Sequence, residues 1–369
     1  MPLIEFRVLA INPGSTSTKI AVYVNERAEW VRCVSHSDAE MEAFRGHPIL
    51  DQLEFRRARI EEELTGAGYA LSDFDAVAGR GGLMRPIASG TYRVNEAMLE
   101  DLRVAAHGEH ASNMGAFLAL SIAASGRALA CVVDPVSVDE LSDKARVSGT
   151  ALAERRSLSH ALNTKAVAKR FARERGKRYE NLRLVVAHLG SGISVSAHEG
   201  GRMVDVNLAG QEGPMSTERA GGLQWLSVVQ LCFSGRYTQE SIYNALFREG
   251  GIYSYLGTKD LREVENRIAK GDAQARLIFE AMVYQVAKEI GAMAAALHGR
   301  VDSILLTGGM ARSEKLIADL RAAIAWIAPM IVYPGEDELQ ALAEGALRVL
   351  RGEEEARELA AEDCVPQHA

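Results

Sequence analysis

The sequence predicts a two-domain α/β protein built from two related halves, and three observations support this. Strand-like apolar runs alternate with segments of helical periodicity along most of the 369 residues, a pattern typical of sheets covered by helices. A chain of this length exceeds the size at which a single core usually stops growing. A shift of 176 residues lays AINPGSTSTKIAV over VAHLGSGISVSAH, and each copy reads strand, small-residue turn, strand.

The expected elements follow this plan along the chain. Apolar runs predict strands at 6–11, 19–24, 30–35, 76–79, 129–134, 182–189, 193–199, 202–207 and 303–309. Helical periodicity predicts helices over 54–67, 163–175 and 273–298, with others beginning near Leu261 and Ser313. The acidic run GEEEARELAAED near the C-terminus is expected to form a solvated helix that packs partly on the first domain. We expect the first domain over 1–145 plus 341–369, with a returning C-terminal helix, and the second over 146–340.

Composition and charge exclude several classes of function. The apolar content of 47% supports large cores, while the net charge of −7 and the pI near 5.8 argue against general binding of nucleic acid or anionic membranes. An anionic substrate would therefore need a local positive pocket. The chain reaches a predicted strand by Phe6, which leaves no room for a signal peptide. Charged residues interrupt the apolar stretch 273–298, so we expect a cytoplasmic protein without a membrane span.

The four cysteines indicate neither a zinc site nor a disulfide framework. Cys33, Cys131, Cys232 and Cys364 are far apart and form no C-x-x-C pair. We expect them to be reduced.

The turn NPGSTSTK has more polar groups than a chain reversal needs. Glycine allows close approach of the backbone, and hydroxyls together with free N–H groups make a concavity that suits phosphate oxygens. Lys19 could add positive charge at its edge; the alternative is a solvated hairpin loop. The related turn HLGSGIS makes a two-sided polyphosphate clamp plausible across a cleft between the halves. No P-loop or Rossmann fingerprint is present.

A third turn, at Gly308 and Gly309, precedes a predicted helix. Paired glycines ahead of a helix N-terminus suit a nucleotide or another anion. The alternative is an ordinary sheet turn.

Several charged residues stand at strand ends, where ligands of open α/β sheets bind. Asp134 could orient Mg²⁺ or cap a turn. Arg80, with Arg85 as a second candidate, could clamp a carboxylate or a phosphate. A lone strand histidine is more often structural, but His188 immediately precedes a phosphate-type turn.

Two further pairs of residues carry less weight from the sequence. Asp260 and Arg262 begin a helix, where the aspartate could equally be an N-cap. His110 and His160 begin or lie within helical segments.

Seven ordered motifs carry a resemblance that none of them carries alone. INPGSTSTKIAVY, VVDPVSVDE, RRSLSHALNTKAVA, VVAHLGSGISVSAH, EGPMSTERAGGL, LCFSGRYT and LLTGGMA together resemble the butyrate kinases of the acetokinase family. That family belongs to the superfamily of acetate and sugar kinases, heat-shock chaperone ATPases and actin. The resemblance implies duplicated ribonuclease-H-like domains with an active-site cleft between them, and a homodimer formed through the second domain or a higher homo-oligomer. It also implies reversible transfer of the ATP γ-phosphoryl group to a short-chain carboxylate, with Mg²⁺.

The resemblance also implies roles for single residues. The first phosphate turn would use Asn12, Ser15, Ser17 and Lys19, and the second His188, Gly190, Ser191 and Gly192. Asp134, His110, His160 and Arg262 would surround the transferring phosphoryl group, with Asp260 beside Arg262, and Gly308 and Gly309 would bind adenosine. Glu338 would contact Mg²⁺ together with Asp134, although Glu336 is close enough to leave the register open.

Two departures from the family pattern bear on the substrate. AVAGRGG replaces an R-V-V-H-G-G type segment, so we expect the substrate carboxylate at Arg80 instead of at an arginine two or three residues earlier. Ser159 replaces a phenylalanine before His160, which would open room for an acyl chain longer than acetate and favours butanoate. Acetate, propionate and branched-chain acids are the alternatives. A remote alternative is an actin-like ATPase switch, although the chain shows no peptide-binding module.

The expected chemistry needs no general base. A carboxylate substrate with a pKa near ~4 is already ionised, so catalysis is positioning and charge stabilisation of an anion that attacks an anion. We expect Arg80 to hold the carboxylate, and His188 and Arg262 to contact the transferring group.

Overall fold

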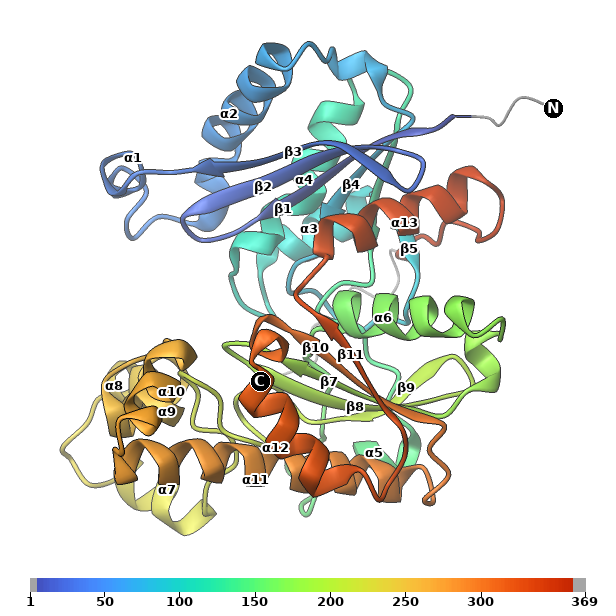
Figure 1. The fold of residues 1–369 in the computed structure, drawn as a ribbon. Helices are drawn as coiled ribbons and strands as arrows, with labels where there is room; N and C mark the ends of the chain where they lie inside the picture. The colour runs from blue at the N-terminus through green and yellow to red at the C-terminus, as the bar shows by residue number, and fades with distance from the viewer. Residues whose placement is uncertain (1–4, 361–369) are drawn as a thin grey trace. The chain divides into compact units, whose positions relative to one another are not determined.

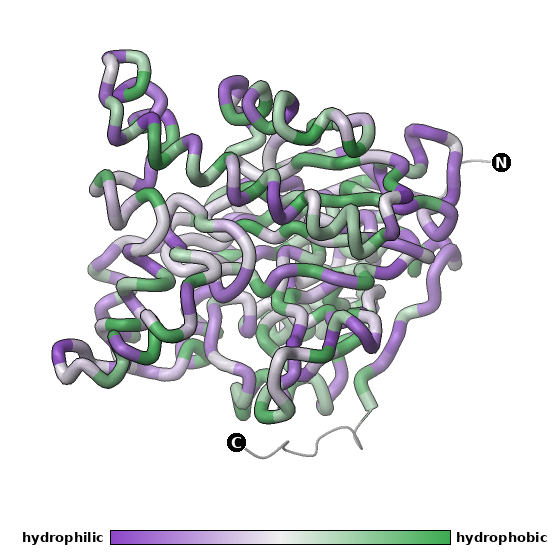
Figure 2. Tube along the Cα trace, turned by 90° about the horizontal axis from the view of Figure 1, so that it is seen from below, coloured by the Kyte–Doolittle hydropathy of each residue, from purple (hydrophilic) through white to green (hydrophobic). Residues whose placement is uncertain are grey.

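The computed structural model describes residues 5–360, which form two compact units. The first unit contains the chain up to Val138 and again from Asp337 onward, and the second runs from Asp139 to Glu336. The chain thus passes between the units seven and four residues earlier than the boundaries expected from the sequence. In Figure 2 hydrophobic and hydrophilic segments alternate along the trace, as they do in sheets and helices that each bury one face.

The first unit contains a six-stranded mixed sheet in the order β3-β2-β1-β4-β6-β5. Strands β1, β2 and β3 form an antiparallel meander, β4 and β6 continue parallel to β1, and β5 closes the edge antiparallel. Their bounds are β1 Arg7–Pro13, β2 Ser17–Val24, β3 Arg27–Ser35, β4 Ala76–Arg80, β5 Thr91–Arg93 and β6 Leu129–Val133.

The second unit repeats this topology in a five-stranded sheet of order β11-β10-β7-β8-β9. Strands β7, β8 and β9 are the antiparallel meander, and β10 and β11 are parallel to β7. Their bounds are β7 Leu184–Leu189, β8 Ile193–Glu199, β9 Arg202–Val206, β10 Ser303–Gly308 and β11 Met330–Pro334. The shared order confirms the duplicated α/β fold that the 176-residue repeat predicted.

All nine strands expected from the sequence are present, and two further strands were missed. Strand β5 has only three residues, which is too short for alternation to be visible. Strand β11 directly follows Pro329, which ends the helical stretch before it, but its apolar run MIVY has only four residues and was overlooked.

Helices cover both faces of each sheet (Figure 1). Their bounds are α1 Asp38–Glu42, α2 Leu53–Gly66, α3 Glu96–Val104, α4 Met114–Ala123, α5 Asp143–Arg146, α6 Ala161–Glu174, α7 Trp225–Cys232, α8 Gln239–Phe247, α9 Gly251–Leu256, α10 Leu261–Ala269, α11 Ala273–Ala296, α12 Glu314–Ile324 and α13 Glu338–Leu350. In the first unit, Ile60 of α2 and Leu118 of α4 share a buried cluster with Leu9 of β1. In the second, Phe279 of α11 and Leu320 of α12 pack against the β7–β10 sheet.

The remaining face of each sheet is covered by a helix that follows the other sheet in the chain. Helix α6 comes after β6 of the first unit but packs on β7 and β10 of the second. Helix α13 comes after β11 of the second unit but packs on β1, β4 and β6 of the first. The two repeats have therefore exchanged their last helices.

The prediction of an acidic helix at the C-terminus is wrong. Helix α13 ends at Leu350, and Gly352 with φ 71° turns the chain away. The next residues run extended beside β5, where the Arg357 N–H donates to the Thr91 carbonyl over 2.8 Å and Glu354 accepts from the Thr91 N–H. This segment packs on the first unit; Glu354 binds the Thr91 N–H and Arg348 Nε, whereas Glu353, Glu355 and Glu358 are exposed. The last part of the predicted helix, 361–363, and Cys364 lie outside the described residues.

Within residues 5–360, none of the helices has the combination of length and apolar character that crossing a bilayer requires.

Candidate functional site

The first phosphate-type turn lies between β1 and β2 with its carbonyl groups bound from inside the first unit. The carbonyls of Ser15 and Ser17 accept from the guanidinium of Arg56 at 3.0 and 3.2 Å. The Thr16 carbonyl accepts from the backbone N–H of His36 at 2.9 Å. Ser15 and Thr16 themselves are exposed. Three successive carbonyl dipoles are thus directed inward, which suits a turn that receives an anion.

Asn12, Arg80 and Glu338 form a polar cluster beside this turn, all within the first unit. Glu338, the first residue of α13, accepts from Asn12 Nδ2 at 2.5 Å and from Arg80 Nη1 at 3.0 Å. Arg80 ends β4, the strand next to β1, which brings the guanidinium to the same sheet edge as Asn12. The structure therefore pairs the arginine expected to hold the substrate with the carboxylate expected to contact Mg²⁺. Lys19 is exposed on β2, across the ladder from Asn12.

Asp134 and Arg85 have structural partners in the first unit. Asp134 has a left-handed backbone with φ 37°, and its Oδ1 accepts from Ser89 Oγ at 2.6 Å and the Gly90 N–H at 2.8 Å. This geometry fits the turn-capping interpretation of Asp134. Arg85 is buried and paired with Asp101, so it does not serve as a second carboxylate clamp in this structure.

His110 lies at the start of the 3₁₀ turn Ala111–Asn113, which leads into α4. Its Nδ1 lies 2.8 Å from Ser112 Oγ. A Cβ at Gly82 would lie 2.4 Å from Asn113 Oδ1, so glycine is required where this turn packs after β4. His110 is thus held on the segment that touches the residues just beyond Arg80.

His188 is the centre of the corresponding cluster in the second unit. Its side chain is 1% exposed, Nδ1 lies 2.9 Å from Asn163 Oδ1, and Nε2 lies 3.1 Å from Glu336 Oε1. Both ring nitrogens thus face polar atoms of neighbouring side chains. His160 stacks on His188 with 3.8 Å between the ring centroids, and its Nδ1 contacts Ser194 Oγ at 2.9 Å.

The two clusters are built alike. Asn12 and His188 are separated by 176 residues and lie near the ends of β1 and β7, the corresponding strands. Asn163 and Glu338, separated by 175 residues, lie in the first turns of the exchanged helices α6 and α13. In each unit the helix residue binds the strand residue. The two glutamates between which the sequence left the metal contact open lie in different clusters, Glu338 in the first and Glu336 in the second.

The second phosphate-type turn, Gly190 to Gly192, packs against Ser216 and Arg219. A Cβ at Gly192 would lie 2.7 Å from Arg219 Nη1, so the guanidinium lies directly on the turn. Ser216 Oγ donates a hydrogen bond to the Ser191 carbonyl. A Cβ at Gly190 would lie 3.0 Å from His188 Nε2. Ser216 and Arg219 were missed by the sequence analysis, although the motif EGPMSTERAGGL that contains them was recognised.

The third glycine turn lies beside the second within the same unit. Gly308 has φ 92°, and a Cβ there would lie 2.3 Å from the Leu189 carbonyl oxygen. Thr307 Oγ1 donates to the Gly335 carbonyl at 3.1 Å, and Gly308 and Gly335 exchange backbone hydrogen bonds of 3.0 Å. Gly309 begins the short 3₁₀ helix that precedes α12. The TGG turn therefore belongs to the same sheet edge as His188.

Asp260 and Arg262 form a surface pair at the start of α10. Asp260 accepts from the Arg262 backbone N–H as N-cap, and Arg262 Nη2 lies 2.7 Å from Asp260 Oδ2 with 87% of its side chain exposed. The hydrogen bond from Arg262 lowers the pKa of Asp260, and the reciprocal bond raises the pKa of Arg262. No contact among the described residues joins this pair to His188. The N-cap interpretation holds, and the arginine on the second turn is Arg219.

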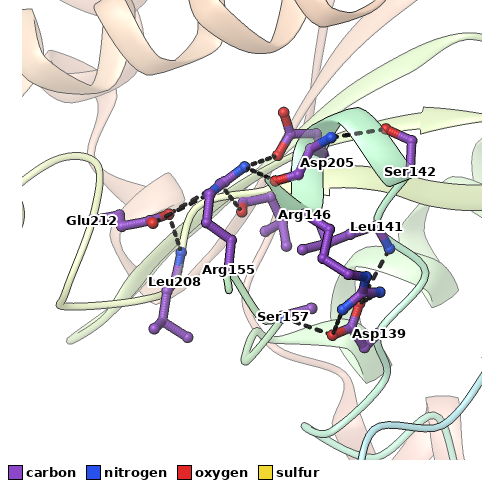
Figure 3. Close-up of polar contacts among 11 residues, drawn as sticks. Asp139, Leu141, Ser142, Arg146, Arg155, Ser157, Asp205, Leu208 and Glu212 are labelled. Atoms are coloured by element: carbon purple, nitrogen blue, oxygen red, sulfur yellow. Dashed lines mark hydrogen bonds and ion pairs between the residues drawn. The ribbon is translucent and has the colours of Figure 1, made fainter. Parts of the chain in front are cut away.

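A network of ion pairs fixes the irregular segment that leads to His160 (Figure 3). The fully buried Asp139 carboxylate binds Arg146 at 2.7 and 3.0 Å and accepts from the Ser157 N–H at 3.1 Å. Arg155 binds Glu212 at 3.0 Å and Asp205 at 3.1 Å, and hydrogen bonding to Glu212 raises the pKa of Arg155. These contacts tie the segment to β9 and the following loop, which limits the movement of His160.

Ser159 is buried within the second unit. Its side chain is 4% exposed, and its Oγ lies 3.7 Å from the Sδ of Met203 on β9. The sequence predicted space for a longer acyl chain at this position. The side chain beside Ser159 is the thioether of Met203, which is flexible and can adapt its shape.

The described residues contain no group of three or more His, Cys, Asp or Glu side chains arranged to hold a metal. Mg²⁺ that arrives with a nucleotide needs only one or two protein carboxylates, because phosphates and waters supply the other ligands. Glu338 meets this requirement in its chemistry, since it is a carboxylate at the edge of the first cluster. Asp134 fits less well, because Oδ1 already accepts two hydrogen bonds.

Comparison with known proteins finds a family match over part of the sequence. Residues 150–327 match the sequence model of the acetokinase family. This range contains the second phosphate-type turn together with His160, His188 and Arg219.

Solved structures of two kinds of carboxylate kinase are similar over nearly the whole chain. Acetate kinase from Porphyromonas gingivalis aligns with a TM-score of 0.75 and 19% identity over 94% of this chain and 100% of its own. A propionate kinase from Francisella tularensis subsp. tularensis SCHU S4 aligns with a TM-score of 0.74 and 17% identity over 92% of this chain and 98% of its own. Acetate kinase from Entamoeba histolytica aligns with a TM-score of 0.72 and 14% identity, also over 92% of this chain and 98% of its own. The chain therefore has the fold of these kinases, which is the actin-like fold that the sequence predicted.

Proposed function

We propose that this protein transfers the γ-phosphoryl group of ATP to a short-chain carboxylate, reversibly, giving an acyl phosphate and ADP. The observation that supports this most directly is the cluster at the second turn, where His188 faces Glu336 and Arg219 lies on Gly192. A histidine and an arginine beside a glycine turn can donate hydrogen bonds to a transferring phosphoryl group. The family match over residues 150–327 covers this cluster.

The reaction needs charge stabilisation more than proton transfer. A carboxylate oxygen attacks the γ-phosphorus, the new O–P bond forms as the bond to the β,γ-bridging oxygen breaks, and ADP leaves with those electrons. His188 and Arg219 would stabilise charge on the equatorial oxygens. The turns at Ser15 and Ser191 would supply N–H and hydroxyl donors to the phosphates. We propose that both polar clusters contribute to this single reaction, with His160, His110 and the TGG glycines in supporting positions.

Arg80 is proposed to bind the substrate carboxylate. Its guanidinium offers a planar fork of donors that matches a carboxylate. One of these donors is bound to Glu338 at 3.0 Å, so binding of Mg²⁺ by Glu338 would free it for the substrate. Mg²⁺ supplies positive charge that neutralises the phosphates. Asp134 would contribute to metal binding through bound water.

Butanoate is the proposed substrate, with acetate, propionate and branched-chain acids as alternatives. The small Ser159 next to the adaptable Met203 supports an acyl chain longer than that of acetate. Ranking kcat/KM for acetate, propionate, butanoate and 2-methylpropanoate at equal ATP tests the chain length. A clear preference for acetate would contradict the interpretation of Ser159.

An acyl hydroxamate assay with ATP, Mg²⁺ and butanoate tests the reaction itself. Hydroxylamine traps the acyl phosphate, so colour forms only when the carboxylate is activated. The variant Arg178→Gln is a matched control, because Arg178 is a mostly exposed arginine of the second unit that pairs with Glu180; it should retain activity while Arg219→Gln loses it. Absence of acyl phosphate with every C2 to C5 acid would reject the proposal and favour an ATPase that switches a partner.

We also propose a homodimer formed through the second unit. Helix α7 has no buried residue, and its large apolar side chains Trp225, Leu226 and Val229 are exposed, as is the following Phe233. An apolar face of this kind usually marks a protein interface. Light scattering coupled to gel filtration would measure the mass.

A further inference from the structure

Arg56 is a buried cation beneath the first phosphate-type turn. It lies on the apolar face of α2, in line with Ile60 and Leu64, and its residue exposure is 0%. Its Nε and Nη2 donate to Gln52 Oε1 at 3.0 and 2.8 Å. Its Nη1 donates to Thr18 Oγ1 at 3.0 Å, in addition to the turn carbonyls. The acceptors of these hydrogen bonds are all uncharged, and no carboxylate among the described residues lies within ion-pair distance of Arg56.

A charge buried without a counter-ion is costly, so its position requires a reason. Burial lowers the pKa of Arg56 to about 10, which still leaves the guanidinium charged at neutral pH. Two of its hydrogen-bond acceptors are carbonyls of the turn whose outer face is expected to meet phosphate. An anion bound at that turn would supply the missing negative charge.

The neighbouring His36 is neutral at pH 7, so Arg56 is the charged side chain of the two. Thr18 Oγ1 accepts from Arg56, and its own proton is therefore directed to His36 Nε2 at 3.0 Å. Burial, with Arg56 as the next contribution, lowers the pKa of His36 to about 4. His36 also holds the turn through its backbone N–H. The support of the turn thus combines one charged and one neutral side chain.

We propose that Arg56 is a positioning residue for phosphoryl transfer, which holds the turn carbonyls of Ser15 and Ser17 inward and places positive charge behind the phosphate-binding face. This inference rests on the proposed function and adds to it a residue that does not touch the substrate. If the inference is right, neutralising Arg56 weakens nucleotide binding more strongly as the number of phosphates on the nucleotide increases.

Gln52→Glu tests the charge without removing the fork of hydrogen bonds. The new carboxylate would bind the same two guanidinium donors and neutralise Arg56 where it stands. We expect a thermal unfolding temperature close to that of the wild type, and an ATP affinity about tenfold lower or more. ADP affinity should fall less, and AMP affinity should stay within about twofold.

Arg56→Met, Arg56→Lys and Arg57→Met complete the experiment. Arg56→Met should lower kcat about 10²-fold or more with little change in the KM for butanoate, and Arg56→Lys should recover part of this loss because it retains the charge. Arg57 is the next residue on α2 and pairs with Glu61 at 2.8 Å; its variant is the matched control and should behave as wild type. If Arg56→Met does not fold, Gln52→Glu and Arg56→Lys decide the question.

Calorimetric titration of the full-length protein with AMP, ADP and ATP gives the result. Equal loss of all three affinities, or unchanged ATP affinity in Gln52→Glu, would show that Arg56 is only structural and would overturn the inference. If the wild type makes no acyl phosphate, the proposed function is rejected. If Gln52→Glu still loses more affinity for ATP than for ADP or AMP, the role of Arg56 in supporting the phosphate-binding turn is kept. A wild type that binds no ATP would overturn both.

Discussion

Replacing His188 by glutamine should remove most of the catalytic rate while the fold survives. Glutamine keeps much of the volume and one hydrogen-bonding end, but it loses the imidazole ring and its stacking on His160 at 3.8 Å. Loss of one preorganised donor to a transition-state oxyanion costs about 10²- to 10³-fold in kcat, or about 2.7 to 4 kcal/mol of barrier. The lost ring stacking should cost about 0.5 to 1.5 kcal/mol of stability, which is too little to unfold a domain of ordinary stability.

His198→Gln is the matched control for this experiment. His198 is equally buried in the same sheet, but its ring contacts Tyr179 Oη at 2.6 Å and Ser196 Oγ at 2.7 Å, away from the glycine turn. Steady-state kcat from a coupled ADP assay, normalised to folded protein by calorimetry, should fall only for the His188 variant. Turnover of His188→Gln within about threefold of the wild type would refute the role of this ring in charge stabilisation. Equal losses in both variants would point to stability instead.

Three further predictions follow from the clusters and the exposed helix. Glu338→Gln should raise the Mg²⁺ concentration for half-maximal activity about 10- to 100-fold, measured by Mg²⁺ titration at fixed ATP; an unchanged titration would exclude Glu338 from metal binding. The folded state disfavours protonated His36, whose pKa falls from 6.5 to about 4, so the free energy of unfolding should drop by about 2 to 3 kcal/mol as pH decreases from 6.5 to 4. Urea titrations should show a smaller drop for His36→Gln, and an identical pH dependence in both proteins would disprove this. Trp225→Glu should convert the proposed dimer to monomer in light scattering, whereas Leu152→Glu, at a residue 95% exposed outside α7, should leave the mass unchanged; a wild-type mass for Trp225→Glu would argue against an interface there.

Much of the fold could be predicted because its signals are local. Each strand of the two meanders shows its own apolar run, and the internal repeat links Asn12 to His188 through the residues alone. Strand β11 was missed because its apolar run MIVY is short, although Pro329 marks the end of the helical stretch before it. The exchange of α6 and α13 was also invisible, because which sheet a helix covers depends on tertiary packing.

The site was predictable where residues share a turn and not where packing brings them together. His188 and the glycines beside it were found from one motif. Arg262 was placed near the phosphoryl group from its motif, but its side chain pairs with its own N-cap, and Arg219 occupies the turn. Arg56 was missed because a helix sequence rich in charges does not show which charge faces the core.

The exchanged helices also set the order in which the molecule can be completed during synthesis. The ribosome delivers the first sheet by Val133, yet Glu338 and the helix that covers this sheet come only after every strand of the second sheet has been made. Until α13 emerges, the nascent first sheet has one bare apolar face, and such surfaces are prone to aggregation. The N-terminal unit is therefore begun first and finished last, and a chain that stops before α13 should yield neither a stable first unit nor its carboxylate.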